Sequence, residues 1–294
     1  MRSSEASKKK ISSPIELPLP IIHRCFKISL VFIFCCSGIV SAAEGLSVHV
    51  VDVSYADAIV LNPHADAVCL IDTGGEESSR KLIEYLKSLD VKRIDKVILT
   101  HGHENHYGGV SALSGAFEVG EVYINPAGSG DEGYEPFLKT LDEKGINVSQ
   151  VQAGQRFSCV DHDIHLDFFL PVLSRSDAYS VNDNALVTLL TFKKISFLLT
   201  SDVGENVQEI LLEQQPFLKN VSVVQVPHHG KALSERLMTD MKGKIFFVST
   251  GANPWGMPNE TALARLEGTL YRTDQQGTIV FDTDGETIKV RLVP

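Results

Sequence analysis

Basic side chains are scarce in this sequence. Its 294 residues contain 27 Lys and Arg against 37 Asp and Glu, which gives a net charge of −10. Residues 1–43 carry six of the basic and two of the acidic side chains, so the remainder has 21 against 35 and a net charge of −14. Because nucleic-acid binding depends on clustered Lys and Arg, this surface disfavours long nucleic acid. A small anionic substrate is not excluded, because a metal ion can supply local positive charge.

Long apolar runs are also lacking. The most apolar stretch, Ile28–Val40, is shorter than the about 20 residues that a membrane-spanning helix needs. A polar, basic segment precedes it, and the small residues Ser41-Ala42-Ala43 follow it. This order is typical of a secretory signal, so we predict that residues 1–43 are a signal peptide and that the protein is exported, to a periplasm or to the outside of the cell. The alternative is an uncleaved membrane anchor, which would be the only part of the chain in contact with a membrane.

Cysteine is rare, since only Cys69 and Cys159 lie outside the predicted signal peptide. Their spacing does not fit a cysteine-rich zinc site, which argues against a structural zinc protein. Both cysteines lie in strand-like runs. Two buried free thiols are the default expectation, and a single disulfide is the alternative in an oxidising compartment.

Residues 44–294 are predicted to form one domain, because no linker or low-complexity segment divides them. About 250 residues are enough to bury a large core. Strand-rich halves with interspersed helices predict an α/β (α+β) fold, a four-layer αββα sandwich of two sheets covered by helices. A monomer or a small homo-oligomer is expected. The predicted strands are near 47–53, 58–61, 68–71, 97–99, 119–124, 149–152, 156–160, 163–170, 185–192, 196–200, 221–226, 245–249, 277–282 and 286–292, and the predicted helices are near 78–89, 106–113, 134–144, 205–214, 234–241 and 260–266.

A histidine-rich run follows the short apolar strand at 97–99, with the sequence Thr100-His101-Gly102-His103-Glu104-Asn105-His106. In extended backbone, side chains at i and i+2 lie on the same side, so His101 and His103 can reach one metal ion. His106 follows where a helix can begin, and Gly108-Gly109 allows close backbone packing behind it. Neutral imidazoles are good ligands for Zn²⁺, Mn²⁺ or Fe. The alternative interpretation is a polar loop that is histidine-rich by chance.

Further ligands are expected at two other strand ends. Asp202 follows the apolar strand at 196–200, and His228-His229-Gly230 follows the strand at 221–226. Taken alone, Asp202 could be a helix N-cap and the histidine pair a surface turn. Three strand ends that all carry such groups favour a shared metal site. The histidines without such grouping are interpreted as surface or core residues, namely His49, His64, His162 and His165.

The histidine run resembles the T-H-x-H-x-D-H-x-G-G signature of the metallo-β-lactamase superfamily. More narrowly, the chain resembles the hydrolase domain of the ComEC-type competence protein, as a stand-alone version without the membrane channel. This resemblance spans about 230 residues in the expected order. It rests on segments 50–58, 70–74, 182–187, 198–202, 226–230 and 271–279, together with the histidine run.

The resemblance implies two metal positions. His101 and His103 would bind the first ion, and His106, His229 and the residue at Asn105 the second, with Asp202 bridging the two. His228 would face the substrate or support a ligand. The implied cofactor is Zn²⁺, one or two ions, with Mn²⁺ as the alternative, and the implied chemistry is attack by a metal-activated water.

The sequence departs from the family pattern at three places. Asn105 stands where the family has an aspartate that both ligates the second metal and orients the water, and its amide cannot take a proton. The isolated histidine between the two halves has no match, because Asn182 or Asp183 lies in that region. Met257 replaces the histidine of a glycine-histidine-proline motif. We therefore expect the second metal position to be the weaker one.

The leading functional prediction is an exported metal-dependent hydrolase that acts on a phosphoester or another ester-like bond. The resemblance favours phosphodiesters and the charge disfavours long DNA, so a small or oligomeric substrate fits both. The alternative function is a non-catalytic metal-binding or scaffold protein whose second metal position was degraded by Asn105.

Overall fold

A computed structural model describes residues 45–62, 64, 67–129, 131–152, 154–158, 163–170 and 180–294. The predicted signal peptide and Cys159 lie outside these residues. The domain boundary at residues 43 and 44 therefore stays a prediction. In the part of the chain that is described, no helix is both long and apolar enough to cross a bilayer.

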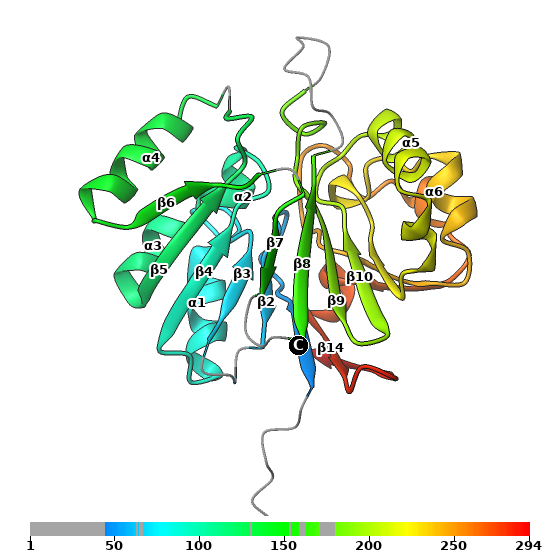
Figure 1. Cartoon of the computed structure of the whole chain (residues 1–294), viewed down its shortest axis with the longest axis horizontal. Helices are drawn as coiled ribbons and strands as arrows, with labels where there is room; N and C mark the ends of the chain where they lie inside the picture. The colour runs from blue at the N-terminus through cyan, green and yellow to red at the C-terminus, as the bar shows by residue number, and fades with distance from the viewer. Residues whose placement is uncertain are drawn as a thin grey trace, which may run out of the picture. The chain divides into compact units, whose positions relative to one another are not determined.

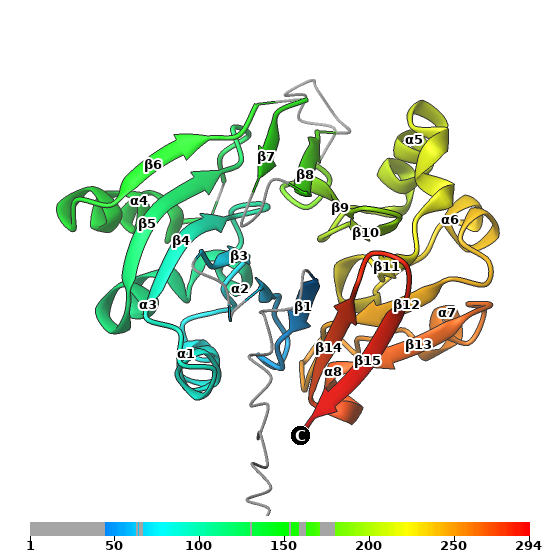
Figure 2. The same cartoon turned by 60° about the horizontal axis from the view of Figure 1, so that its bottom comes forward.

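Two sheets face each other in the middle of the structure (Figures 1 and 2). The first sheet has eight strands in the order β15 (Ile288–Val293), β14 (Thr278–Thr283), β1 (Leu46–Val50), β2 (Ile59–Leu61), β3 (Cys69–Ile71), β4 (Arg93–Ile98), β5 (Glu118–Ile124) and β6 (Asn147–Gln150). The second sheet has seven strands in the order β13 (Thr269–Arg272), β12 (Ile245–Val248), β11 (Val223–Gln225), β10 (Ile195–Leu199), β9 (Val187–Phe192), β8 (Ile164–Phe169) and β7 (Arg156–Ser158).

Each sheet contains a parallel half. Strands β3 to β6 pair in parallel in the first sheet, and strands β10 to β13 pair in parallel in the second. The carboxyl ends of parallel neighbours lie at the same edge of a sheet, which is where open α/β sheets bind their ligands. The segments after β4, β10 and β11 therefore start from such edges.

Helices cover the outer faces of both sheets (Figure 2). The first sheet is covered by α1, α3 and α4, and the second by α5, α6 and α7. The helices are α1 (Ser79–Ser88), α2 (Glu104–Tyr107), α3 (Val110–Ala116), α4 (Tyr134–Glu143), α5 (Glu205–Gln214), α6 (Glu235–Asp240), α7 (Glu260–Leu263) and α8 (Thr273–Gln276), with 3-10 turns η1 (Pro216–Asn220) and η2 (His228–Gly230).

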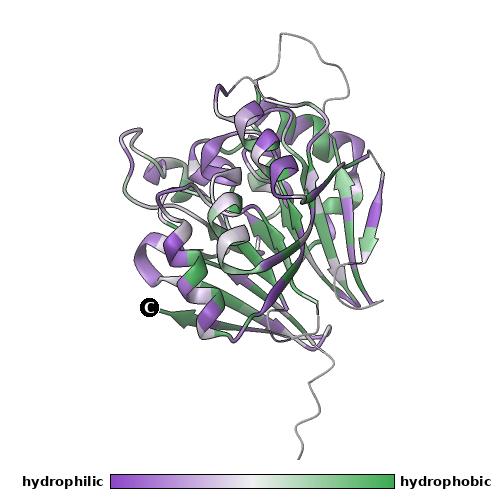
Figure 3. Cartoon of the chain, turned by 90° about the vertical axis from the view of Figure 1, so that its left-hand side faces the viewer, coloured by the Kyte–Doolittle hydropathy of each residue, from purple (hydrophilic) through white to green (hydrophobic). Residues whose placement is uncertain are grey.

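Alternation along the strands separates the apolar side chains into three layers. In β10, Phe197 and Leu199 join the cluster between the sheets, whereas Leu198 joins the cluster under the helices of the second sheet. In β1, Leu46 and Val48 likewise face the opposite sheet. Because both faces of each sheet are buried, the central strands are almost continuously apolar, and Figure 3 shows their hydrophobic colour between helices of mixed hydropathy. The predicted four-layer αββα sandwich is confirmed.

The structure differs from the predicted elements at three places. The single helix expected near 106–113 is two short helices, α2 and α3, because the Gly108-Gly109 pair lies between them. Strand β13 and helix α8 were not predicted. Cys69 is disulfide-bonded, so the default expectation of a free thiol was wrong at this position.

Candidate metal centre

The histidine run lies at the carboxyl end of β4, where the chain turns into α2. His101 is 1% exposed, and its Nε2 lies 3.1 Å from His103 Nδ1. The i, i+2 spacing thus brings the two imidazoles together, as the extended geometry predicted. His103 is the residue immediately before α2, with an extended backbone.

His106 points inward from α2 and is fully buried. Its Nδ1 lies 2.8 Å from Asp72 Oδ2, and Asp72 also accepts hydrogen bonds from the backbone N–H and the hydroxyl of Thr100, both at 2.8 Å. Because a carboxylate can only accept, His106 Nδ1 carries the proton and Nε2 faces the centre of the site. Asp72 follows β3, the parallel neighbour of β4, so the two strand ends fix this pair.

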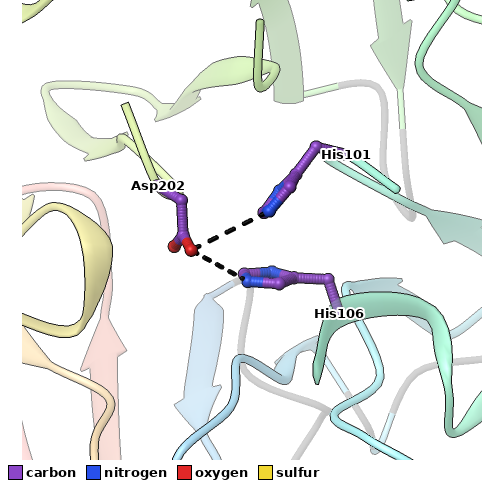
Figure 4. Close-up of side chains that lie close together, drawn as sticks. All are labelled: His101, His106 and Asp202. Atoms are coloured by element: carbon purple, nitrogen blue, oxygen red, sulfur yellow. Dashed lines mark ion pairs between the residues drawn. The ribbon is translucent and has the colours of Figure 1, made fainter. Parts of the chain in front are cut away.

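Asp202 brings the second sheet into the site. It follows β10, is 2% exposed, and directs Oδ2 toward four imidazoles. Figure 4 shows it facing His101 and His106, which come from the other sheet. The distances from Asp202 Oδ2 are 3.8 Å to His101 Nε2, 3.3 Å to His106 Nε2, 3.7 Å to His228 Nε2 and 3.7 Å to His229 Nε2.

His229 is held by the neighbouring strand end. Its Nδ1–H donates to the carbonyl of Ser249, which follows β12, at 2.9 Å. This leaves the lone pair of Nε2 facing the site, and the Asn105 amide nitrogen lies 3.0 Å from it. His228 is less deeply buried, and the amide nitrogen of Asn182 lies 3.3 Å from its Nε2.

The pKa values in the cluster follow from burial and mutual attraction. Burial lowers the pKa of His101 well below its ordinary value and lowers the pKa of His228 to about 4. For His106 burial acts in the same direction, but the carboxylates of Asp202 and Asp72 outweigh it and raise the pKa well above 6.5. Burial would raise the pKa of Asp202, but His229 and His106 outweigh it and hold this pKa well below the ordinary value. The opposite shifts of Asp202 and His106 show that the two groups attract each other.

Backbone strain surrounds this cluster. Asp72, Ser201, His228 and His229 all have positive φ, between 49° and 58°, although none is a glycine. Such conformations cost free energy and persist where the surrounding structure holds them. Two of these residues, His228 and His229, are predicted site residues. The other two, Asp72 and Ser201, form hydrogen bonds next to the site.

The donor set fits a divalent metal ion. Three sets of potential ligands lie among the described residues, each with its donor atoms within 4.8 Å of one another: His101, His106 and Asp202; Asp57, Asp202 and His229; Asp57, Asp72 and His106. His106 Nε2, Asp202 Oδ1 and Asp57 Oδ1 are buried and have no hydrogen-bond partner. Buried polar atoms are normally paired, and a cation bound by imidazole nitrogens and carboxylate oxygens would satisfy all three.

Sequence reasoning missed Asp57 and Asp72. Asp57 is 2% exposed, and burial raises its pKa to about 6. Asp72 was detectable, because it stands directly after an apolar strand as Asp202 does. Asp57 precedes its strand, β2, so only the fold brings it to the site. His103 belongs to none of the three ligand sets, although it contacts His101.

A pocket of about 750 Å³ opens over the cluster. His103, Asn105, Asp202 and His228 line its floor, together with Asn182. Aromatic, basic and acidic side chains are among the other lining residues, namely Tyr55, Trp255, Lys81, Lys231, Glu77, Glu104 and Asp131. The Tyr55 ring lies 4.4 Å from His229 and 4.8 Å from Trp255, centroid to centroid, and Trp255 is 64% exposed. Met257, at the position of the missing family histidine, accepts a hydrogen bond from the Tyr55 hydroxyl at 3.1 Å.

Comparisons with known proteins agree with this architecture. Residues 51–171 match the model of the metallo-β-lactamase superfamily. The chain is 27% identical to ComE operon protein 3 of Bacillus subtilis over 282 residues, which cover 87% of this chain and 35% of that protein. It is 26% identical to Recombination protein 2 of Haemophilus influenzae over 212 residues, 70% of this chain and 24% of that protein. The chain thus spans about a third of the length of the first relative and about a quarter of the length of the second.

A third relative is the probable metallo-hydrolase YqjP of Bacillus subtilis, which is 32% identical over 122 residues, 36% of this chain and 38% of that protein. Among solved structures, unliganded yeast PDE1 is similar with a TM-score of 0.51 and 11% identity over 77% of this chain and 97% of that one. A mutant of CmlA β-hydroxylase has a TM-score of 0.50 and 16% identity over 80% of this chain and 53% of that one. The superfamily match, the relatives and the two facing sheets confirm the resemblance inferred from the sequence, and residues 51–171 match a metallo-β-lactamase domain.

Proposed function

We propose that this protein is an exported metal-dependent hydrolase that cleaves a phosphoester or another ester-like bond of a small or oligomeric substrate. The observation that carries the proposal is the convergence of His101, His106 and Asp202 from two sheets, with buried donor atoms of His106 and Asp202 left unpartnered. Asp202 also lines an open pocket. The metallo-β-lactamase domain and the similarity to a probable metallo-hydrolase support a hydrolase in general.

The expected cofactor is Zn²⁺, one or two ions, with Mn²⁺ as the alternative. When bound, such an ion supplies Lewis-acid chemistry and lowers the pKa of water. The chain itself supplies the ligands and their orientation. Asp72 fixes the tautomer and ring position of His106, and the Ser249 carbonyl does the same for His229. Partners of this kind hold metal ligands in place.

The remaining pocket residues are proposed to bind the substrate. Lys231 and Lys81 lie along the pocket wall and can attract an anionic group, although Lys81 is also paired with Asp52 at 3.2 Å. The exposed Trp255 offers an apolar face at the rim. His228, which lines the pocket beside Asp202, is placed to contact a substrate oxygen. A pocket of this size accommodates a small molecule or one end of an oligomer.

The proposal is tested by a screen of chromogenic phosphodiester, phosphomonoester, lactone and cephalosporin substrates, each with added Zn²⁺ or Mn²⁺. Activity with at least one substrate is expected, and it should be lost on chelation and in His101→Ala and Asp202→Ala. The matched control is His64→Ala, which removes an exposed histidine on a turn and should retain full activity. Activity that survives both chelation and Asp202→Ala would exclude the proposed chemistry.

One observation favours a second candidate, a non-catalytic binding or scaffold protein. The Asn105 amide nitrogen faces the Nε2 atom of His229, so a donor stands where a metal ligand is expected. The substitution Asn105→Asp separates the two candidates. If the native protein is inert on every substrate and Asn105→Asp creates metal-dependent activity, the scaffold function is correct. If the native protein is active, the hydrolase function is correct.

A further inference from the structure

Asp57 is held next to Asn105 by the backbone. It lies between the bend at Ser54 and strand β2, its N–H donates to the Asn105 carbonyl at 3.4 Å, and its own carbonyl accepts from Gly74 N–H at 2.7 Å. The two side chains are therefore presented to the same region of the site, although 48 positions separate them in sequence. Asp57 is almost completely buried.

The two carboxylate oxygens of Asp57 have different surroundings. Oδ2 accepts a hydrogen bond from Gln225 Nε2 at 2.8 Å, and Gln225 in turn accepts from the backbone N–H of Ser201 at 3.0 Å. Gln225 thus ties Asp57 to the segment that carries Asp202. Oδ1 is buried without any hydrogen-bond partner.

The Asp57 carboxylate belongs to a set of potential ligand groups. One oxygen of Asp57, one of Asp202 and one ring nitrogen of His229 lie within 4.8 Å of one another. A carboxylate that only stabilises the fold at this depth would satisfy both oxygens with donors, as Asp72 does with Thr100 and His106. Asp57 and Asp202 each keep one oxygen unpaired instead, and two buried carboxylates this close are unfavourable without a cation between them.

Asn105 accounts for the need for an additional negative ligand. Its neutral amide donates toward His229 rather than offering charge. Among the residues that the structure describes, only Asp202 and Asp57 bring anionic oxygens to His229 on this side of the site. We propose that Asp57 supplies the acidic ligand of the second metal position, together with Asp202 and His229, in place of a carboxylate at Asn105. This assignment rests on the proposed metal-dependent function, and it makes Asp57 a metal ligand.

The test measures zinc binding by the full chain, using Zn²⁺ alone as the probe. Metal-free protein is titrated against a chromogenic chelator, and the ions that remain after gel filtration are counted. The native protein is expected to bind two ions, and Asp57→Asn to retain the first while its affinity for the second falls at least about 100-fold, beyond the 10- to 100-fold typical of outer partners. Asp52→Asn is the matched control, an aspartate of the same segment that pairs with Lys81, and it should bind as the native protein does.

A second variant separates ligation from a structural role. The double variant Asp57→Asn/Asn105→Asp should recover the second ion, because a carboxylate again faces His229. The thermal midpoint of metal-free Asp57→Asn should equal or exceed that of the native protein, since an unpaired buried carboxylate has been removed. A lower metal-free midpoint, an unchanged second affinity, or failure of the double variant to recover the ion would each overturn the assignment.

The outcome also distinguishes the two proposals. A native protein that binds no zinc at all contradicts the assignment, and one that binds neither Zn²⁺ nor Mn²⁺ contradicts the hydrolase function as well. A native protein that binds one ion at saturation contradicts the assignment alone. If two ions bind and depend on Asp57, but no substrate is cleaved, the ligand assignment stands and the hydrolase function fails.

Discussion

At the scale of single residues, Asp202 lies close to two histidines, His106 and His229, that are more than 90 positions apart in sequence. Its Oδ2 lies 3.3 Å from His106 and 3.7 Å from His229, and each of these histidines uses its other ring nitrogen for a hydrogen bond to its own side of the molecule. Because both Nδ1 atoms are committed, both Nε2 atoms face the centre. The ring orientations required for metal binding are therefore set by the protein's own hydrogen bonds.

The first prediction concerns the partner of His106. Asp72→Asn keeps the shape of the side chain but removes the charge that fixes the imidazole, so zinc affinity should fall about 10- to 100-fold. The measurement is competition with a chromogenic chelator, and Asp52→Asn serves as the control because it also removes one aspartate charge. An affinity within twofold of the native value would show that Asp72 does not orient His106.

The substrate side of the site gives a second prediction. Trp255 lines the pocket beside Tyr55 and is 64% exposed. Its ring is therefore open to contact with a bound substrate. For any substrate that the protein cleaves, Trp255→Ala should raise KM about tenfold, the loss of about 1.4 kcal/mol of binding, with less than a twofold change in kcat. Phe217→Ala is the control, because this residue is also an exposed aromatic and does not line the pocket. A fall in kcat with KM unchanged would contradict a binding role.

At the scale of elements, the corner between α2 and α3 depends on close backbone contact. A Cβ atom on Gly109 would lie 2.2 Å from the Thr73 carbonyl oxygen, and Thr73 N–H donates to the His106 carbonyl at 2.8 Å. The glycine pair thus lets the segment after β3 pack directly against the histidine-bearing corner. This was expected from the sequence, and the contacts confirm it.

Replacing this glycine gives the third prediction. Gly109→Ala should lower the free energy of unfolding by about 2 to 3 kcal/mol, because backbone must move to admit the methyl group. Gly115→Ala is the matched control in the adjoining helix α3, where a Cβ would meet nothing within 4 Å. It should be neutral or raise stability by about 0.5 to 1 kcal/mol. Chemical denaturation of both variants, measured without metal, checks the pair, and equal effects would contradict the packing argument.

A buried histidine in β1 gives a pH-dependent prediction. His49 contacts Ser47 and Tyr85 through its two ring nitrogens, both at 2.6 Å. Burial, followed by the charge of Arg291, lowers the pKa of His49 from 6.5 to about 4. Between these two values the unfolded chain binds a proton that the folded chain does not, so stability is lost as the pH falls from 6.5 toward 4.

The measurement is the difference in unfolding free energy between pH 7 and pH 4.5, with a chelator present. The native protein should lose about 2 kcal/mol more than His49→Gln over this interval. His64→Gln, which changes an exposed neighbour of His49 whose charge is the smallest cause of the lowered pKa, should lose nearly as much as the native protein. Parallel losses in the native protein and His49→Gln would show that His49 takes up its proton in the folded state.

The local sequence pattern predicted most helices and strands, but it missed two of them. The strands near 185–192 and 196–200 were predictable, because runs of Val, Leu, Ile and Phe of strand length are typical of buried sheet. Strand β13 (Thr269–Arg272) was missed because it is short and only its last residue, an arginine, is buried, so burial left little apolar pattern in its sequence. Helix α8 follows it at once and has only four residues, which is below the length at which periodicity can be recognised.

At the scale of the whole molecule, the limits of sequence reasoning have a different cause. Groups placed directly after apolar strands, such as His101 and Asp202, could be predicted because the carboxyl ends of parallel strands converge. Asp57 could not, because it precedes its strand and reaches the site only through the antiparallel pairing of β1 with β2 and the contact with Gln225. A residue whose position depends on the packing of two sheets leaves no signal in its neighbours along the chain.

The candidate metal centre is built from residues of both sheets. His101, His106 and Asp72 extend from strands of the first sheet, whereas Asp202 and His229 extend from strands of the second. An ion held between them binds only the folded arrangement, so it adds stability by mass action, about 4 kcal/mol at a concentration 1,000 times its Kd. For a domain of this size each kcal/mol shifts the thermal midpoint by about 2 to 4 °C.

Chelation should therefore lower the thermal midpoint of the zinc-loaded protein by about 8 to 16 °C. Asp202→Asn, which lacks the central carboxylate, should show the same midpoint with and without the chelator. His64→Ala should respond as the native protein does, since this side chain is exposed. If the native midpoint does not change on chelation although zinc is released, the ion contributes nothing to holding the sheets together, because the hydrogen bonds of Asp72 and Ser249 already fix both sides of the site without it.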